Sequence, residues 1–183
     1  MLYKIFKKIK RFAEKRFLRK QVKYSEKHYC KTCVFEEGVK IQNPNVVLGK
    51  GVTLNSNVII CGRGRVFIDD NAIIGYNTII YSHFDSSVYI GKNTAIAANV
   101  YIVDTNHSTE KLDLSIDNPI AGADKSEPIF IGNNVWVCSG CILGKGTRLG
   151  DCSVVGANSF VNQEIPSEAI AVGNPAKVIK YRR

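Results

Sequence analysis

Long apolar stretches are missing from this sequence. None of its 183 residues lies in a run that approaches the about 20 apolar residues of a membrane-spanning helix. The start of the chain also lacks the continuous apolar region of a secretory signal, because its apolar residues alternate with lysines. We therefore expect a cytoplasmic protein, either soluble or bound to a membrane surface, whose six cysteines are reduced.

Metal-binding patterns are also scarce. The chain has three histidines, and two Cys-x-x-Cys spacings, Cys30 with Cys33 and Cys138 with Cys141, invite a zinc or redox interpretation. A structural zinc needs four ligands, which neither local sequence supplies. We expect no metal site.

Basic charge is concentrated at one end of the chain. Residues 1–20 hold nine Lys and Arg against the single Glu14, a net charge of +8, which leaves +1 of the total +9 for the rest. The nearly neutral remainder has no basic stripe with interleaved aromatic residues. The composition therefore argues against a nucleic-acid partner.

A six-residue repeat dominates the rest of the sequence. From Ile131 it reads IGNNVW VCSGCI LGKGTR LGDCSV VGANSF, and the same frame recurs from Leu48, Ile68 and Ile90. Each block opens with an aliphatic residue, and in the run from Ile131 the fifth position holds a side chain of modest size: Val135, Cys141, Thr147, Ser153 and Ser159. Neither the period of a helix nor that of a strand places one aliphatic residue inward at every sixth position.

A triangular parallel β-solenoid explains this period. Each block would form one flat face and one corner, three blocks would complete a coil, and several coils would bury a continuous core. The glycine or asparagine beside each corner would tolerate unusual backbone angles. Cys141 then occupies a small interior position, which explains it without a metal. The predicted fold class is all-β.

These blocks, together with VGNPAKVIK at 172–180, resemble the hexapeptide-repeat acyltransferases over about residues 40–180. The stretches IGKNTAIAANVYIVDTNHS and EPIFIGNNVWVCSG are similar to the branch of galactoside, maltose, nodulation-factor and polysaccharide O-acetyltransferases. The resemblance implies a left-handed parallel β-helix acyltransferase domain over 23–183 with a C-terminal closing segment. It also implies a homotrimer with active sites between subunits.

The repeat stops at a histidine. The frame is expected to hold through the block from Ile102 to His107 and to be absent at about 108–130, which predicts an outward loop at a corner. A lone histidine is often an ordinary surface residue, but His107 stands where the resemblance places the general base, and imidazole suits that role. Asp104 or Glu110 would orient its ring, and Asp104 is also a candidate substrate contact.

The resemblance further implies direct attack of a sugar hydroxyl on acetyl-CoA, with an oxyanion held by backbone N–H groups near Ser139 and Gly140. Trp136 would line the active-site tunnel. Asn77 would bind the acceptor, although a corner asparagine with a left-handed backbone is an equal alternative.

The remaining expected coenzyme contacts lie toward the C-terminus. Ser139, Gly140 and Ala157 would contact the pantetheine arm, and Lys177 and Lys180 would meet the phosphates of coenzyme A. The sequence departs from several relatives at 162–163, where Asn-Gln replaces Thr-Lys.

The favoured function is acetyl-CoA-dependent O-acetylation of a sugar in surface polysaccharide or glycolipid biosynthesis. N-acetylation of a nucleotide-linked amino sugar, antibiotic acetylation and a non-catalytic solenoid stay open as alternatives. The γ-class carbonic anhydrases share the fold, but they need a second histidine shortly after the first, and Leu112 stands five residues beyond His107.

Residues 1–22 form a predicted basic amphipathic helix. Its apolar positions are spaced by three and four: Leu2, Ile5, Phe6, Ile9, Phe12 and Ala13. Such a helix either caps the solenoid or packs in the trimer, or it binds an anionic membrane surface through residues 1–20, and its high positive charge favours the membrane. The protein would then be peripheral at the inner face of the cytoplasmic membrane.

Overall fold

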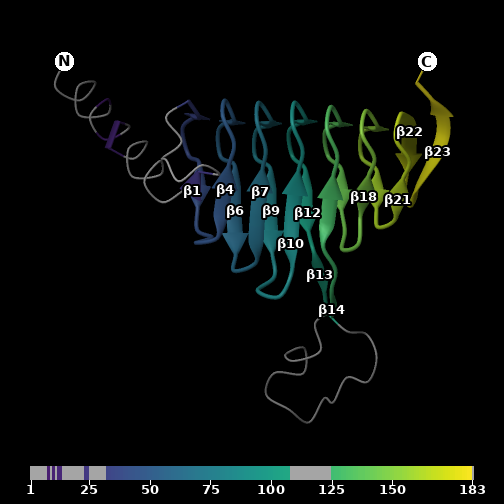
Figure 1. The fold of residues 1–183 in the computed structure, drawn as a ribbon, viewed down its shortest axis with the longest axis horizontal. Coiled ribbons are helices and arrows are strands. Elements are labelled where there is room, and N and C mark those ends of the chain that lie inside the picture. Colours follow the sequence, from purple (N-terminus) through teal and green to yellow (C-terminus); the bar gives the residue numbers. More distant parts are fainter. Residues whose placement is uncertain are drawn as a thin grey trace, which may run out of the picture.

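A computed structural model describes residues 32–107 and 125–182, together with positions 8, 10, 12, 13, 23 and 24. The described chain winds as a parallel β-solenoid in which successive coils stack along one axis (Figure 1). Each coil contributes one short strand to each of three flat faces. The predicted all-β solenoid is confirmed.

The three faces follow one another along every coil. Face 1 contains β1 Lys23–Tyr24, β4 Val46–Leu48, β7 Arg65–Ile68, β10 Ser87–Ile90, β15 Ile129–Ile131, β18 Arg148–Leu149 and β21 Glu164–Ile165. Face 2 contains β2 Val34–Phe35, β5 Thr53–Leu54, β8 Ile73–Ile74, β11 Ala95–Ile96, β16 Trp136–Val137, β19 Val154–Val155, β22 Ala169–Gly173 and β23 Ala176–Tyr181. Face 3 contains β3 Lys40–Ile41, β6 Ile59–Gly62, β9 Ile79–Ser82, β12 Tyr101–Val103, β17 Ile142–Leu143 and β20 Phe160–Val161.

The core is the ladder that the repeat predicts. Block-opening residues are buried in every coil, and those predicted from the sequence are Leu48, Leu54, Ile68, Ile74, Ile90, Ile96, Ile102, Ile131, Val137, Leu143, Leu149 and Val155. Fifth-position residues are buried with them, including polar ones such as Thr147. The Thr147 hydroxyl donates to the carbonyls of Gly144 at 2.7 Å and Val161 at 2.8 Å, so its burial leaves no unpaired polar group.

Two of the three corners are regular left-handed turns. Asparagines such as Asn77 and Asn93 have φ angles of 57° and 54° there, which confirms the expected role of asparagine. The glycines that follow the block-opening residues have a different reason. A Cβ added to Gly91 would lie 2.6 Å from the backbone of Gly132, so close stacking of neighbouring coils, not a special angle, excludes a side chain.

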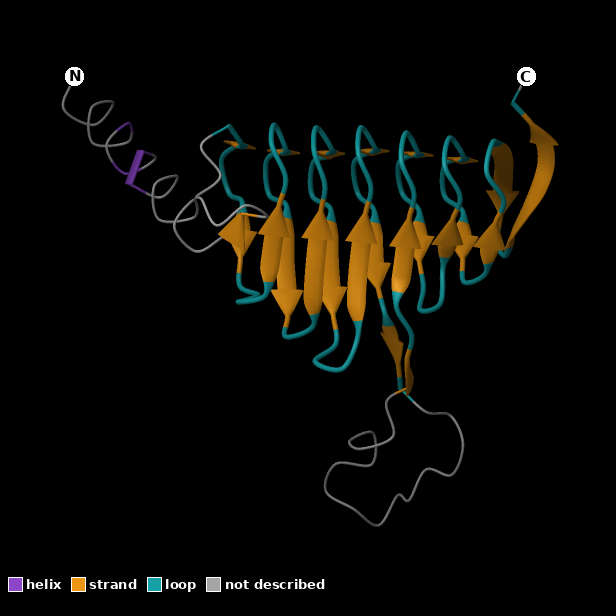
Figure 2. Ribbon diagram, in the orientation of Figure 1, coloured by secondary structure: helices purple, strands orange, loops and turns teal. Residues whose placement is uncertain are grey.

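The third corner, where face 3 leads into face 1, is irregular in three successive coils. We call it the insertion corner (residues 62–64, 82–86, 104–107 and 125–128). Its connections project at the same edge of the solenoid (Figure 2). Beyond β12 the chain leaves the stack as β13 Thr105–Asn106, which pairs antiparallel with β14 Lys125–Ser126.

The repeat therefore ends earlier than predicted. The block from Ile102 was expected to run to His107, but the frame already fails at Asp104, and Asn106, at its fifth position, is exposed. The ladder resumes at Ile129, which is buried opposite Val88, and not after residue 130. At the point where the frame fails, the Asp104 carboxylate is buried and accepts hydrogen bonds from Ser82 and His83 of the preceding coil.

At the C-terminus the last two strands lie side by side on face 2. β23 pairs antiparallel with β22 and so ends the parallel ladder of face 2. At the N-terminus, positions 8, 10, 12 and 13 are helical and exposed, whereas the other residues of the predicted helix lie outside the described part of the chain. Among the described residues, no helix has the length and apolarity needed to cross a membrane.

The cysteines differ from expectation at one position. Cys33 is disulfide-bonded, so the prediction that all six are reduced is wrong for this residue. Cys61, Cys138, Cys141 and Cys152 are free thiols. Within the described ranges, no three His, Cys, Asp or Glu side chains are grouped so that they could hold a metal ion.

Candidate active site

His107 lies at the end of a short hairpin that leaves the insertion corner. Strand β13 directly precedes it, and the pairs Thr105–Ser126 and Asn106–Lys125 hold this strand against β14. The His107 residue itself is exposed. The backbone is thus fixed up to the histidine while the residue stays accessible to a substrate. Residues 108–124, including Glu110, lie outside the described part of the chain.

Asp104 anchors the base of this hairpin from within. Its carboxylate is completely buried and accepts hydrogen bonds from Ser82 Oγ at 2.7 Å and from the His83 backbone N–H at 2.7 Å. Its carbonyl accepts a bond from the Glu127 N–H at 3.0 Å. Burial raises the pKa of Asp104, and these hydrogen bonds oppose that rise. The structure thus places Asp104 beneath the surface, as a link between the hairpin and turn 82–86.

A second link joins the hairpin to the same turn. His83 Nδ1 lies 2.5 Å from Asp85 Oδ1, and Ser126 Oγ donates to that same oxygen at 2.6 Å. The hydrogen bond from Ser126 and then the one from His83 hold the pKa of Asp85 below its ordinary value. Sequence reasoning missed this cluster. Its only signal was the loss of the six-residue frame after Ile80.

The expected coenzyme contacts lie elsewhere, together with the predicted substrate-binding residue Trp136, on face 2 and at its corner with face 3. Trp136 stands outward on β16 and is 53% exposed. Lys177 and Lys180 lie on β23 of the same face and are exposed. Three further residues occupy the turns between faces 2 and 3: Ser139, Gly140 and Ala157. One chain therefore brings Trp136 and the predicted coenzyme contacts together along a single side of the solenoid. We call these contacts the coenzyme set: Ser139, Gly140, Ala157, Lys177 and Lys180.

Some of these predicted residues already have structural partners. The Gly140 N–H donates to the Ala98 carbonyl at 3.1 Å, so in this structure that amide is occupied. The Asn77 amide lies in a ladder of corner asparagines, 3.1 Å from Asn57 and 3.3 Å from Asn99. Asn77 thus has the geometry of the corner alternative, and an acceptor would have to share its amide.

The departure from relatives at 162–163 also has a local explanation. Gln163 Nε2 donates to the Ala176 carbonyl at 2.8 Å and so ties β23 to the preceding coil.

His107 and the coenzyme set are not brought together within one chain. The hairpin leaves the corner between faces 3 and 1, whereas the coenzyme set lies on face 2 and at the corner between faces 2 and 3. The prism separates these two corners by the width of face 3.

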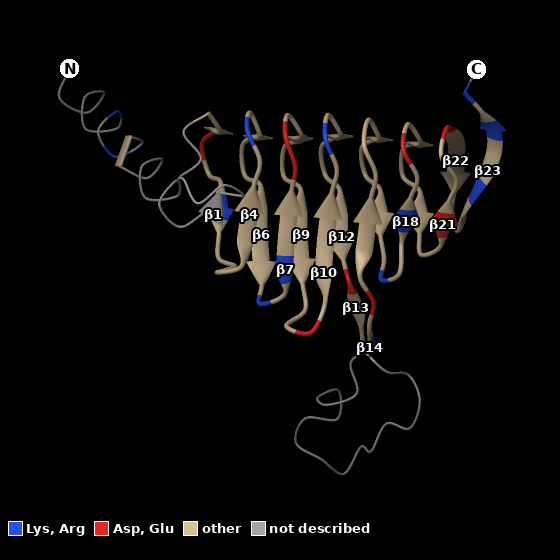
Figure 3. Cartoon of the chain, in the orientation of Figure 1, with Lys and Arg blue, Asp and Glu red and all other residues tan. Residues whose placement is uncertain are grey.

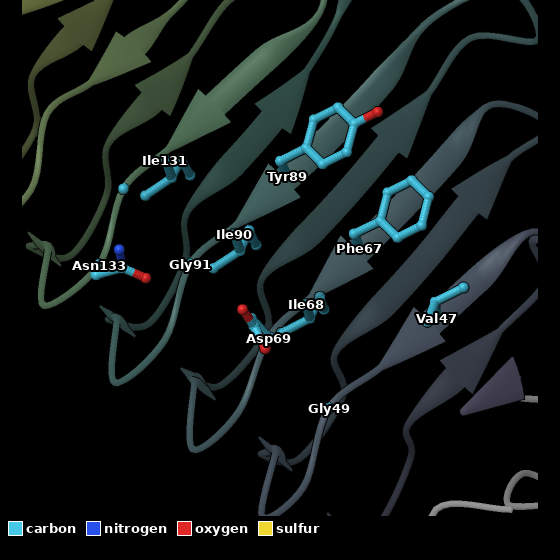
Figure 4. A pocket seen from close by; sticks show the side chains of 11 residues that line it. Val47, Gly49, Phe67, Ile68, Asp69, Tyr89, Ile90, Gly91, Ile131 and Asn133 are labelled. Carbon is cyan, nitrogen blue, oxygen red and sulfur yellow. The ribbon is translucent and has the colours of Figure 1, made fainter. Parts of the chain in front are cut away.

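Face 1 carries a hollow lined in part by aromatic residues, among them Phe67 and Tyr89 (Figure 4). Phe67 and Tyr89 stack nearly parallel at 4.9 Å, Tyr89 and Phe130 at 4.8 Å, and the Arg148 guanidinium lies 4.6 Å from the centre of the Phe130 ring. The ring faces cover one another, which stabilises the stacked coils but leaves mainly ring edges for a ligand.

Two family models match the repeat. Residues 128–163 match the bacterial transferase hexapeptide model (six repeats). Residues 65–103 match the hexapeptide repeat of succinyl-transferase.

Whole-protein relatives carry the similarity further. WbbJ of Escherichia coli, named for O-acetyl transfer in lipopolysaccharide biosynthesis, is 35% identical over 140 residues, which cover 74% of this chain and 68% of WbbJ. Galactoside O-acetyltransferase of Escherichia coli is 32% identical over 167 residues, which cover 91% of this chain and 79% of that enzyme.

Solved structures agree on the fold. AntD, an N-acyltransferase from Bacillus cereus in complex with dTDP and 3-hydroxybutyryl-CoA, superposes with a TM-score of 0.78 at 19% identity, over 93% of this chain and 88% of AntD. The hexapeptide-repeat acetyltransferase VCA0836 from Vibrio cholerae, complexed with acetyl-CoA, has a TM-score of 0.60 at 23% identity, over 95% of this chain and 77% of that one. Together with the repeat, the solenoid and relatives above 30% identity, these findings show that the chain is an acyltransferase and belongs to the hexapeptide-repeat acetyltransferase family.

Proposed function

We propose that this enzyme transfers an acetyl group from acetyl-CoA to a hydroxyl of a sugar used in surface polysaccharide or glycolipid synthesis, with His107 as the general base. The observation that carries this proposal is the placement of His107, which is exposed at the end of a hairpin anchored to a rigid solenoid. A base held on a fixed backbone but open to solvent can meet a bulky acceptor.

The proposed reaction is a direct transfer. The sugar oxygen attacks the thioester carbonyl carbon while a ring nitrogen of His107 accepts its proton. The tetrahedral intermediate carries negative charge on the former carbonyl oxygen, which a backbone N–H stabilises. Because the Gly140 amide is bonded to Ala98, the Ser139 amide is the better candidate donor. The carbon–sulfur bond then breaks, and the imidazolium returns its proton to the thiolate, giving the acetyl ester and free coenzyme A.

Two groups of relatives bear on the acceptor. The relatives above 30% identity include two named for O-acetyl transfer. Among the structural neighbours, AntD is an N-acyltransferase also solved with dTDP-4-amino-4,6-dideoxyglucose. Oxygen acetylation is the first proposal because the closer sequence similarity favours it, and nitrogen acetylation of an amino sugar is the second. Both use the same base and the same thioester.

Replacement of the base tests this function. With acetyl-CoA and a panel of sugars, nucleotide sugars and lipid-linked glycans, His107→Ala should reduce the rate of free thiol release by about 10² to 10⁴, as expected for loss of a general base. The affinity for acetyl-CoA, measured by calorimetry, should stay unchanged, since the substitution removes none of the predicted coenzyme contacts.

His28→Ala is the matched control, because it removes a histidine to which the proposed reaction gives no role. Its thiol release should equal that of the wild type. Full acetyl transfer by His107→Ala would refute the assigned base. Hydroxyl and amino versions of each responding sugar, compared side by side, separate O-acetylation from N-acetylation.

A further inference from the structure

A second hollow opens at the insertion corner, where turn 82–86 separates it from the hairpin of His107. It encloses about 310 Å³ and is lined by Asn45, Val47, Arg63, Arg65, Phe67 and Phe84. Val47 and Phe67 pair across β4 and β7 on face 1. Arg65 and Phe67 are two residues apart on β7, so both point outward from the same face. Phe84 lies on turn 82–86 and is 70% exposed.

The backbone that carries the two arginines is held rigidly. The N–H groups of Arg63 and Gly64 donate to the Ser82 carbonyl at 3.0 and 2.9 Å. From the preceding coil, the Asn45 side chain donates to the Arg63 carbonyl at 2.8 Å, and the nearly buried Asn43 donates to the Gly64 carbonyl at 3.0 Å. Two guanidinium groups are thereby presented from a turn that neighbouring coils fix on both sides.

Gly64 shows how closely this turn packs. A Cβ at Gly64 would lie 2.0 Å from the His83 carbonyl oxygen and 2.2 Å from Ser82 Oγ, so no side chain fits there. Ser82 and His83 are also the residues that donate to Asp104. Turn 82–86 therefore contacts both the turn at residues 62–64, which precedes β7, and the base of the hairpin that ends in His107.

Among the described residues, the arginines of this hollow have no ion-pair partner. The ion pairs within the described ranges are His83–Asp85, Lys92–Asp70 and Lys145–Glu127, and neither Arg63 nor Arg65 takes part in one. The basic end of β7 and the turn before it lie next to the acidic turn between β9 and β10 (Figure 3). Its carboxylate, Asp85, is already bound by Ser126 and His83. Guanidinium groups without a carboxylate partner favour an anion.

We infer that this hollow binds the phosphoryl group of the acceptor, so that the substrate is a sugar phosphate or sugar diphosphate rather than a neutral free sugar. The arginines bind the phosphoryl oxygens, and the apolar surfaces of Phe84 and Phe67 accommodate the adjoining sugar or carrier group. This inference rests on the proposed sugar acetylation, because it concerns the acceptor of that reaction.

Binding of inorganic pyrophosphate tests the hollow without catalysis. Calorimetry of the full chain with saturating coenzyme A, which fills the coenzyme site, should show pyrophosphate binding. Arg65→Gln and Arg63→Gln should each weaken it about tenfold or more, as loss of a charge-assisted hydrogen bond implies. Lys92→Gln is the matched control, since it removes one exposed positive charge at another corner. Equal affinities in all four proteins would overturn the inference.

Kinetics then connect the hollow to the acceptor. The same sugar is offered free, as a nucleotide diphosphate and as a lipid-linked diphosphate in detergent. Arg65→Gln should raise KM for a phosphorylated form about tenfold and leave KM for acetyl-CoA unchanged, and the form that responds identifies the carrier. If KM for acetyl-CoA rises instead, the bound anion belongs to the coenzyme and the inference is wrong.

Failure of the two proposals can be distinguished. Suppose the wild type acetylates no sugar but binds pyrophosphate in an Arg65-dependent way. The proposed function then fails while the anion site stands. If the wild type acetylates neutral sugars as well as phosphorylated ones, and the arginine substitutions change neither, the proposed function stands and this inference falls.

Discussion

At the scale of single residues, Asp104 should affect both the stability of the protein and the pH dependence of that stability. It is a buried carboxylate whose two oxygens accept bonds from Ser82 Oγ and the His83 N–H. Asp104→Ala removes the acceptor of the His83 N–H and leaves the buried Ser82 hydroxyl only its longer bond to the Arg65 carbonyl, at 3.4 Å, which should lower the free energy of unfolding by about 3 kcal/mol. Asp104→Asn should cost less, because its amide oxygen can accept from His83 and its amide nitrogen can donate to the Ser82 hydroxyl. Chemical denaturation at a fixed protein concentration measures both.

The same carboxylate should make stability depend on pH. Its folded pKa is raised above the ordinary 3.8, mainly by burial, so between the two values the folded state binds more protons than the unfolded state. This contribution to the free energy of unfolding is fully present below the ordinary value and is lost as the pH rises through the folded one. The Asp104→Asn protein lacks this contribution. Its free energy of unfolding should therefore rise relative to that of the wild type as the pH rises from acid to neutral. A constant difference between the two proteins would contradict this role.

At the scale of elements, the hairpin β13–β14 positions His107 through contacts made by its other strand. Ser126 on β14 donates to Asp85, which also meets His83. Ser126→Ala should lower kcat about tenfold, since a loosened hairpin misplaces the base, and should leave KM for acetyl-CoA unchanged. It should also speed amide hydrogen exchange at Thr105 and Asn106.

Ser167→Ala serves as the control for the hairpin substitution, because it removes an exposed serine hydroxyl from a turn between faces 1 and 2. It should change neither kcat nor exchange in β13. If Ser126→Ala changes KM for acetyl-CoA and kcat by the same factor, the effect is general destabilisation and the positioning role is wrong.

The elements also show where sequence reasoning works in this fold. Positions such as Leu143 and Thr147 could be assigned to the core from spacing alone, because every coil repeats the same local geometry. The contacts of Asp104 and Asp85 could not be predicted from spacing. Their partners Ser82 and Ser126 are 22 and 41 residues away and lie in turns that break the six-residue frame, so no period relates them. The reason for Gly91, close approach to Gly132, likewise depends on a neighbouring coil.

At the scale of the whole molecule, the separation of His107 from the coenzyme set has a structural consequence. Strands of face 3 lie between the hairpin corner and the corner that holds Ser139 and Ala157. A direct transfer needs the base and the thioester within contact distance. Because a rigid solenoid cannot fold these two corners together, we expect the proposed base and the predicted coenzyme contacts to meet only where the face of a second copy completes the site. A closed ring of three copies would provide three equivalent sites.

Mixed assemblies test this arrangement. Chains carrying His107→Ala lack the base, and chains carrying Lys177→Glu and Lys180→Glu lack the proposed phosphate contacts of the coenzyme. Each should be inactive alone. If each site combines the hairpin of one chain with face 2 of its neighbour, random co-assembly joins an intact hairpin to an intact face 2 in about a quarter of the sites. Thiol release should therefore return to about a quarter of the wild-type rate, measured after co-expression and purification of the mixed assembly. In the control, chains that carry all three substitutions are co-expressed with either of the two variants. These chains contribute neither an intact hairpin nor an intact face 2, so they should restore no activity. Activity that does not rise above that of the parents would place the complete site within one chain.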